Sequence, residues 1–154
     1  MPLMTASDAI PPPVYDTPDG PRRLVLADLV ARFATATARQ ASRYEAAAGQ
    51  AEGDLREALE GLARAKQLEV RDLAPLARAL GAAPPPPPPP AASGTPHWGV
   101  ILGEAFQAER VLEGLGRELT GLTADPGVKV LGSRLTAEVL RDREEVRKLY
   151  LRYS

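Results

Sequence analysis

Residues 103–122 read GEAFQAERVLEGLGRELTGL, and this stretch decides the fold of the chain. Together with the residues just before it, the stretch carries apolar side chains at intervals of three, four and seven, which lie on one face of an α-helix. The apolar face consists of Trp98, Leu102, Ala105, Leu112 and Leu119. Glu109 interrupts this face near its middle. The stretch therefore predicts an amphipathic helix with an acidic group on its buried side.

Three further stretches repeat the pattern of apolar side chains along one helical face. The apolar positions of the first are Leu26, Val30, Phe33, Tyr44 and Ala48. Those of the second are Leu55, Leu59, Leu62 and Leu73. Those of the last are Val128, Leu131, Leu135, Val139, Val146 and Leu149. Four such helices predict an all-α fold in which the apolar faces pack together as a four-helix bundle.

Polar side chains interrupt each of the four apolar faces near the middle of its helix. The interrupting residues are Thr37, Gln40, Lys66, Glu69, Glu109 and Asp142. In a bundle these groups would meet, because they stand at similar positions along their faces. We therefore predict an interior polar cluster of the kind that binds metal in some bundles.

Proline, glycine and acidic residues mark the ends of the first two helices. Residues 19–21 read Asp-Gly-Pro and fit the start of the first helix, and Gly49 fits its end. The second helix is expected to start near Glu52. Pro75 is expected to end or kink it, because proline removes a backbone hydrogen bond.

The third and fourth helices open with a common signal, a capping residue followed by proline. Thr95 and Pro96 mark the third helix, and Asp125 and Pro126 mark the fourth. The link within each pair of helices is short, which favours antiparallel neighbours. The chain is thus predicted to form two αα-hairpins.

The two hairpins are joined by residues 81–95, which include an unbroken proline run from Pro84 to Pro90. Polyproline II rises ~3.1 Å per residue, so this joint could span roughly 45 Å. A helix of about 27 residues is ~40 Å long. We therefore predict a full-length crossover that leaves the second and third helices parallel. As an alternative role, the proline run could bind an SH3-like protein partner.

The bulk composition sets broad limits on the protein. The chain has 154 residues, no cysteine and a formal net charge of −1. This length fits one domain with a real core, and the lack of cysteine excludes disulfides and thiolate metal sites. The charge predicts no attraction to nucleic acid or anionic membrane, and no apolar run is long enough to span a bilayer. We expect a cytoplasmic protein with a flexible tail at residues 1–20 and a bundle at residues 21–154.

The layout of the two hairpins resembles the ferritin-like superfamily, and its rubrerythrin-like branch in particular. The first hairpin reads RFATATARQASRYEAAA and LREALEGLARAKQLEVRDL, and the second reads GEAFQAERVLEGLGRELTGL and DPGVKVLGSRLTAEVLRDREEVRKL. These are similar to the family's pattern of a Glu followed by a Tyr two turns later, then Leu-Ala and a Glu-x-x-His. The resemblance covers residues 21–150. It implies two hairpins with one long crossover, built around a di-iron site.

Carried over residue by residue, the resemblance implies a degenerate di-iron site. The family's ligand positions fall, in chain order, on Thr37, Lys66, Glu69, Glu109, Val139 and Asp142. Only Glu109 matches the family's residue type in full. Both expected histidines are missing, and the single histidine, His97, stands at the start of the third helix, away from the cluster.

Three carboxylates, those of Glu69, Glu109 and Asp142, would share the bundle interior and would need a cation or protons. The cation could be iron or manganese held by these oxygen ligands. It could instead be the ammonium of Lys66, which lies on the same helical face as Glu69. We favour Lys66, because its positive charge lowers the affinity for a metal nearby. We expect it to pair with Glu109, which stands at a similar depth in the bundle.

These features favour a non-catalytic bundle of unknown role, an interaction or structural module that has lost its di-iron site and needs no cofactor. The alternative is a rubrerythrin-like or ferritin-like metal-binding protein, for iron handling or oxidoreductase chemistry, with an unusual carboxylate site. A third hypothesis is a scaffold whose N-terminal tail and proline run recruit a protein partner. We also expect a homodimer, because several leucines lie off the main apolar faces and need another cover. These are Leu24, Leu29, Leu68 and Leu76.

Overall fold

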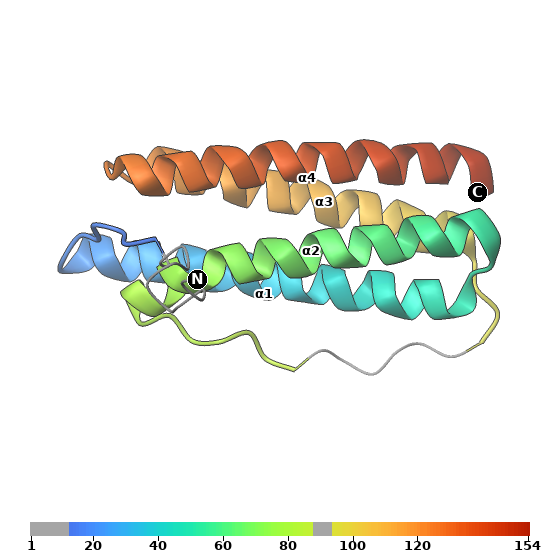
Figure 1. Cartoon of the computed structure of the whole chain (residues 1–154), viewed down its shortest axis with the longest axis horizontal. Helices are drawn as coiled ribbons and strands as arrows, with labels where there is room; N and C mark the ends of the chain where they lie inside the picture. Colours follow the sequence, from blue (N-terminus) through green and yellow to red (C-terminus); the bar gives the residue numbers. More distant parts are fainter. Residues whose placement is uncertain (1–12, 88–93) are drawn as a thin grey trace, which may run out of the picture.

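A computed structural model describes residues 13–87 and 94–154 of the chain. Within these ranges the chain forms four α-helices and no strand. The helices are α1 (Pro21–Gln50), α2 (Gly53–Leu80), α3 (Trp98–Leu122) and α4 (Pro126–Tyr153). α1 lies against α2 and α3 lies against α4, and the two pairs stack as a bundle (Figure 1). The predicted all-α class is confirmed, and no helix in the described ranges has the length and apolar character needed to cross a membrane.

α3 begins at the end of the bundle where α1 ends and α2 begins (Figure 1). Gln50, the last residue of α1, donates a hydrogen bond from Nε2 to the Gly94 carbonyl oxygen at 3.2 Å. Trp98 packs against the apolar cluster at this same end. α2 and α3 therefore run in the same direction. Residues 88–93 lie outside the described ranges, so the polyproline conformation expected for residues 84–90 stays a prediction.

α2 runs through Pro75 without a break and ends at Leu80. Gly81 follows in the left-handed conformation, with φ of 67°. The expectation that Pro75 could end this helix was wrong. Proline removes one backbone hydrogen bond, but Leu76 and Leu80 beyond it are both buried, and their burial outweighs that loss.

The sequence signals at the other helix starts agree with the structure in part. Asp125 caps α4, since its Oδ2 accepts a hydrogen bond from the Val128 N–H at 2.9 Å. Gly20 is the N-cap of α1, with φ of 67° and ψ of −144°, a conformation that essentially only glycine adopts. α3 begins at Trp98 rather than at the predicted Pro96.

The apolar core divides into two clusters, one toward each end of the bundle, and the predicted polar residues lie between them. Leu29 and Leu76 are fully buried in one of these clusters, so the expectation that they need an outside cover was wrong. α1 packs against both α2 and α3, so its buried surface is wider than the apolar face predicted from the sequence. Leu24 and Leu68 are 72% and 48% exposed, as expected from their positions outside the main apolar faces.

α3 and α4 approach each other closely through two glycines. A Cβ added at Gly132 would lie 3.1 Å from the backbone nitrogen of Thr120 and 3.3 Å from its Cα. A Cβ added at Gly116 would lie 3.4 Å from the Cα of Thr136. Each threonine hydroxyl donates to the carbonyl oxygen of the glycine one turn earlier in its own helix, at 2.9 and 2.7 Å. Gly116 of α3 therefore packs against Thr136 of α4, and Gly132 of α4 packs against Thr120 of α3.

Gly132→Ala is expected to destabilise the fold by about 1–3 kcal/mol, the usual range for an overpacked core position. The new methyl group would meet the backbone of Thr120, which cannot rotate away. Gly114→Ala is the matched control, since a Cβ there meets nothing within 4 Å. The control should gain about 0.5–1 kcal/mol from its better helix propensity. Urea unfolding measures both variants, and an equal gain in the two would contradict the close contact of α3 and α4.

Candidate functional site

Lys66 of α2 lies in the middle of the bundle with its side chain fully buried. Its Nζ is 2.5 Å from Oε1 of Glu109, 3.1 Å from Oε2 of Glu69 and 3.0 Å from Oδ2 of Asp142. These carboxylates come from α3, α2 and α4. One oxygen from each thus faces the same ammonium. The pairing of Lys66 with Glu109 that the sequence predicted is present, and it is the shortest of the three contacts.

α1 supplies hydrogen bonds to the other oxygen of Glu109. The Tyr44 hydroxyl donates to Glu109 Oε2 at 2.5 Å. Gln40 Nε2 donates to the same oxygen at 3.0 Å and to the Ala105 carbonyl oxygen at 3.0 Å. Thr37 is also buried, but its hydroxyl donates to a carbonyl oxygen of its own helix at 2.8 Å. Glu109 is therefore held between the ammonium on one side and two neutral donors on the other.

The six residues of the predicted polar cluster are all buried, and the structure adds a seventh, Tyr44. In the sequence, Tyr44 fits the apolar face of the first helix because its ring is apolar. Its hydroxyl also belongs to the polar cluster. The position of Tyr44 one turn after Gln40 could have indicated this, since a tyrosine on a buried face needs a partner for its hydroxyl. His97 is the N-cap of α3 and lies outside the cluster.

The cluster has two negative charges in excess when every group is ionised, because three carboxylates face one ammonium. Each of the three oxygens nearest to Nζ has the Lys66 ammonium 2.5–3.1 Å away, and within the described part of the chain none of them has another partner. The contacts of Lys66 with Glu109 and Glu69 combine Coulombic attraction with charge-assisted hydrogen bonding. Buried charge of one sign is relieved by protons or by a cation.

Burial sets the direction of most pKa shifts in the cluster. It raises the pKa of Glu69 to about 8 and also raises that of Glu109, while the Lys66 ammonium acts in the opposite direction on both. Burial acts to lower the pKa of Lys66, but Glu109, Glu69 and Asp142 together raise it by more. Burial and then Glu109 raise the pKa of Tyr44 well above its usual range. At neutral pH Lys66 is therefore charged, and Glu69 and Tyr44 hold their protons.

The free energy of unfolding is expected to fall as the pH rises from about 5 to about 8. The folded chain keeps a proton on Glu69 up to a pKa of about 8, whereas an unfolded glutamate releases it near about pH 4.3. The folded state thus binds more protons in this window. The resulting slope is negative and at most ~1.4 kcal/mol per pH unit for each such group. Urea unfolding at several pH values measures it.

Glu69→Gln is the matched variant for this pH dependence, because glutamine keeps the shape but does not titrate. The variant should show a flatter slope than the wild type. Part of the remaining slope would come from Glu109, which faces Lys66 and Tyr44, and part from Glu138, because burial raises the pKa of both. An unchanged slope in the variant would contradict the raised pKa of Glu69.

Asp142 connects the cluster to the surface. It is 8% exposed and lines a groove of about 590 Å³ between α2 and α4. Ala58 and Gly61 of α2 also line the groove, and their small size leaves this space open. Asp54 and Arg152 lie 3.5 Å apart at its wall. Solvent can therefore approach the edge of the cluster from this side.

The cluster is suited to holding a cation, and it presents no free nucleophile. Lys66 is protonated and enclosed by carboxylates. Glu69, Glu109 and Asp142 are the residues that could ligate a metal, but the ammonium lies between their oxygens. Across residues 13–87 and 94–154, no group of three or more His, Cys, Asp or Glu side chains is arranged to hold a metal ion.

Comparison with known proteins gives no further guide to the role of this site. No family of known proteins, no curated protein and no solved structure matches the chain. The ferritin-like resemblance is therefore carried by the residues quoted above alone.

Proposed function

We propose that the chain is a non-catalytic ferritin-like helical bundle, an interaction or structural module in which Lys66 takes the place of a metal ion. The observation that carries this proposal is one ammonium within 2.5–3.1 Å of an oxygen from each of three carboxylates. In di-iron bundles, carboxylates on facing helices project inward onto the metal. Here an equivalent set of side chains converges on a cation that belongs to the protein itself. In such a bundle the ammonium offsets one negative charge of the cluster, and the proton held by Glu69 removes another.

The residues of the cluster do not fit a resident di-iron centre. Such centres in bundles use histidines one turn after glutamates. Glu69 and Asp142 stand where the resemblance places those histidines, and His97 lies outside the cluster. The Lys66 ammonium would also repel a divalent ion bound to the same oxygens.

The ferritin-like topology and its polyproline crossover are supported by the lengths involved. α2 has 28 residues and is ~42 Å long at ~1.5 Å per residue. Gly81 and Gly94 have positive φ, so residues 82–93 are the part of the joint that could adopt polyproline II, and they would span roughly 37 Å at ~3.1 Å per residue. With the flanking residues up to Trp98, the joint would cover the length that parallel α2 and α3 require.

A rubrerythrin-like or ferritin-like protein that binds iron or manganese is the second candidate. It is favoured by the excess of negative charge and by Glu69, which holds a proton that a cation could displace. Its ligands would be Glu69, Glu109 and Asp142. Lys66 would then have to turn away from all three carboxylates.

Metal analysis distinguishes the two candidates. Protein expressed in medium supplemented with iron and manganese should contain neither metal in stoichiometric amount. Calorimetric titration of the purified chain with Mn²⁺ should give no saturable binding. Stoichiometric metal that is retained by the wild type and lost from Glu109→Gln would overturn the first candidate in favour of the second.

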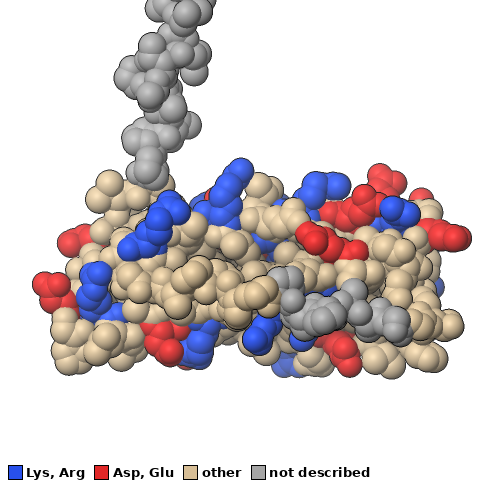
Figure 2. Space-filling model, turned by 90° about the horizontal axis from the view of Figure 1, so that it is seen from below, with Lys and Arg blue, Asp and Glu red and all other residues tan. Residues whose placement is uncertain are grey.

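The module is proposed to act as a homodimer. The exposed Leu24 and Leu68 are apolar side chains that a second copy could cover. Figure 2 shows acidic and basic side chains interspersed on one face, which fits a protein contact better than nucleic acid. Light scattering should give twice the mass of one chain, and Leu68→Glu should reduce it to that of one chain. A wild type with the mass of one chain at high concentration would contradict the dimer.

A protein partner could also bind the N-terminal tail or the proline run, as the scaffold hypothesis holds. Residues 1–12 of the tail and residues 88–93 of the joint lie outside the described ranges. This hypothesis and the expected cytoplasmic location therefore rest on the sequence. A peptide of residues 1–20 that binds the same protein as the full chain would support the scaffold role.

A further inference from the structure

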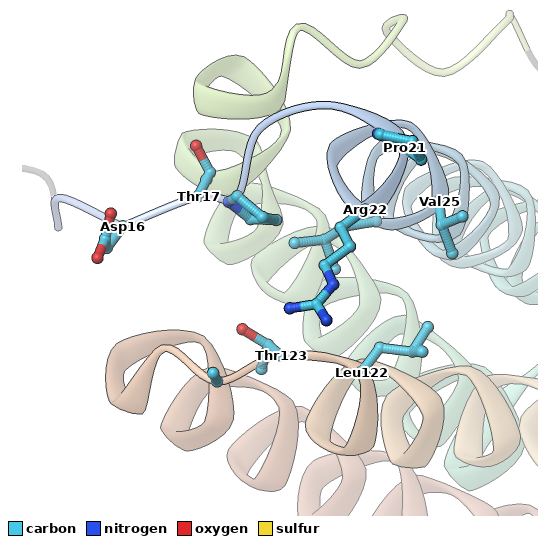
Figure 3. Close-up of a pocket in the computed structure, with 10 residues that line it drawn as sticks. Asp16, Thr17, Pro21, Arg22, Val25, Leu122 and Thr123 are labelled. Carbon is cyan, nitrogen blue, oxygen red and sulfur yellow. The ribbon is translucent and has the colours of Figure 1, made fainter.

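A second hollow lies at the end of the bundle where α1 begins and α3 ends (Figure 3). Its volume is about 520 Å³, within the range of ~300–1,000 Å³ that small-molecule pockets occupy. Residues 16–18, the first turns of α1 and residues 122–124 form its walls. None of the Lys66 cluster residues lines it, so this pocket is independent of the function proposed above.

The outer wall of the pocket is the segment that precedes α1. Gly20, with its positive φ, turns this segment back across the end of the bundle. Tyr15 packs against the apolar core. Arg23 donates from Nη1 to Thr17 Oγ1 at 3.0 Å and from Nη2 to the Ala79 carbonyl oxygen at 2.8 Å. These contacts hold residues 15–17 against the bundle, and a preformed wall lowers the entropic loss on binding.

Most of the pocket surface is apolar. Pro21, Val25 and Leu26 contribute from α1, and Leu122 contributes from the end of α3. Val25 and Leu122 are 55% and 54% exposed and both line this hollow (Figure 3). Single exposed apolar side chains are common on protein surfaces. Two in one concave site indicate a ligand with an apolar body.

Arg22 brings a positive charge to this apolar site. Figure 3 shows its guanidinium pointing from α1 toward Leu122 and Thr123. Within the described ranges Arg22 takes part in no ion pair, and Asp16 lies at the far edge of the pocket. The first turn of α1 holds no acidic residue and no side-chain cap, so no side chain of that turn offsets the positive end of the helix dipole.

We propose that this pocket binds an organic carboxylic acid with an apolar body, of the size of a medium-chain fatty acid. The carboxylate pairs with Arg22, whose planar guanidinium matches it with two parallel hydrogen bonds. The hydrocarbon covers Val25 and Leu122 and rests on Leu26. A neutral molecule of the same length gains the apolar contact but lacks the ion pair.

Nuclear magnetic resonance titration of the ¹⁵N-labelled full chain with decanoate tests the proposal. Decanoate should shift the signals of residues 22–26 and 122–124 and leave those around Lys66 unchanged. Decanol should bind about tenfold or more weakly, because it lacks the charge that strengthens the hydrogen bonds. No shift with decanoate, shifts centred on Lys66, or equal binding of decanol would each overturn the proposal.

Two arginine variants of α1 identify the group that recognises the carboxylate. Arg22→Gln should weaken decanoate binding by about tenfold or more. Arg39→Gln removes an exposed arginine from the middle of the same helix and should leave the affinity unchanged. Circular dichroism checks that both variants are folded. Wild-type affinity in a folded Arg22→Gln variant, or an equal loss in the two, would show that Arg22 is not the carboxylate partner.

Discussion

Lys66→Met is expected to lower the free energy of unfolding by about 3–5 kcal/mol, as does removal of one partner from other buried ion pairs. Methionine has a similar length, so the change leaves little cavity and mainly removes the ammonium. The remaining negative charge of the cluster would then be buried without a cation, and protons or water would have to relieve it. Urea unfolding at neutral pH measures the loss. Lys129→Met, which alters an exposed lysine of α4, should change stability by no more than about 0.5 kcal/mol.

Glu109→Gln in the same chain should recover part of that loss. The amide is neutral, and its oxygen can still accept the hydrogen bond from Tyr44. A double-mutant cycle on Lys66 and Glu109 should give a coupling energy of about 0.5–3 kcal/mol, as for other contacting residues. If the two single effects simply add, then the ion pair contributes nothing to stability and the central role of Lys66 is wrong.

The position of the cluster could be predicted because helical periodicity leaves little freedom there. Lys66 stands seven residues after Leu59 and seven before Leu73. Any regular helix that buries both leucines must also bury Lys66. Asp142 stands in the same way between Leu135 and Leu149. The polar residues at these positions were therefore predictable as interior groups, and the ion pair followed from the need to compensate buried charge.

Other features could not be predicted because they depend on neighbouring helices. Leu29 and Leu76 lie outside the main apolar faces of α1 and α2. They are buried because the helices pack in a four-helix bundle and not as one isolated pair. Pro75 breaks the local rule for helices, and only the burial of the residues after it explains why α2 continues. The pocket beside Arg22 draws its walls from residues 16–26 and residues 122–124, which are distant in sequence, so no local pattern indicates it.

Lys66→Glu should convert the cluster into a site for a divalent ion. Glutamate is shorter than lysine by one bond, so its carboxylate would end just short of the present ammonium position. An ion at that position would be faced by the three carboxylates already in the cluster and by the new one, which is the all-oxygen environment that Mn²⁺ prefers. Without metal, four buried carboxylates should leave the variant far less stable than the wild type.

Thermal unfolding with and without Mn²⁺ measures this conversion. Mn²⁺ at about a hundredfold excess over its Kd should stabilise the Lys66→Glu variant by about 2.7 kcal/mol, because it binds the folded state alone. Lys66→Gln is the control, since it removes the ammonium without adding a carboxylate, and it should respond less. If the glutamate variant does not fold alone, refolding in Mn²⁺ should restore its helical circular dichroism. A wild type that gains as much stability from Mn²⁺ as the variant would show that Lys66 does not hold the place of a metal.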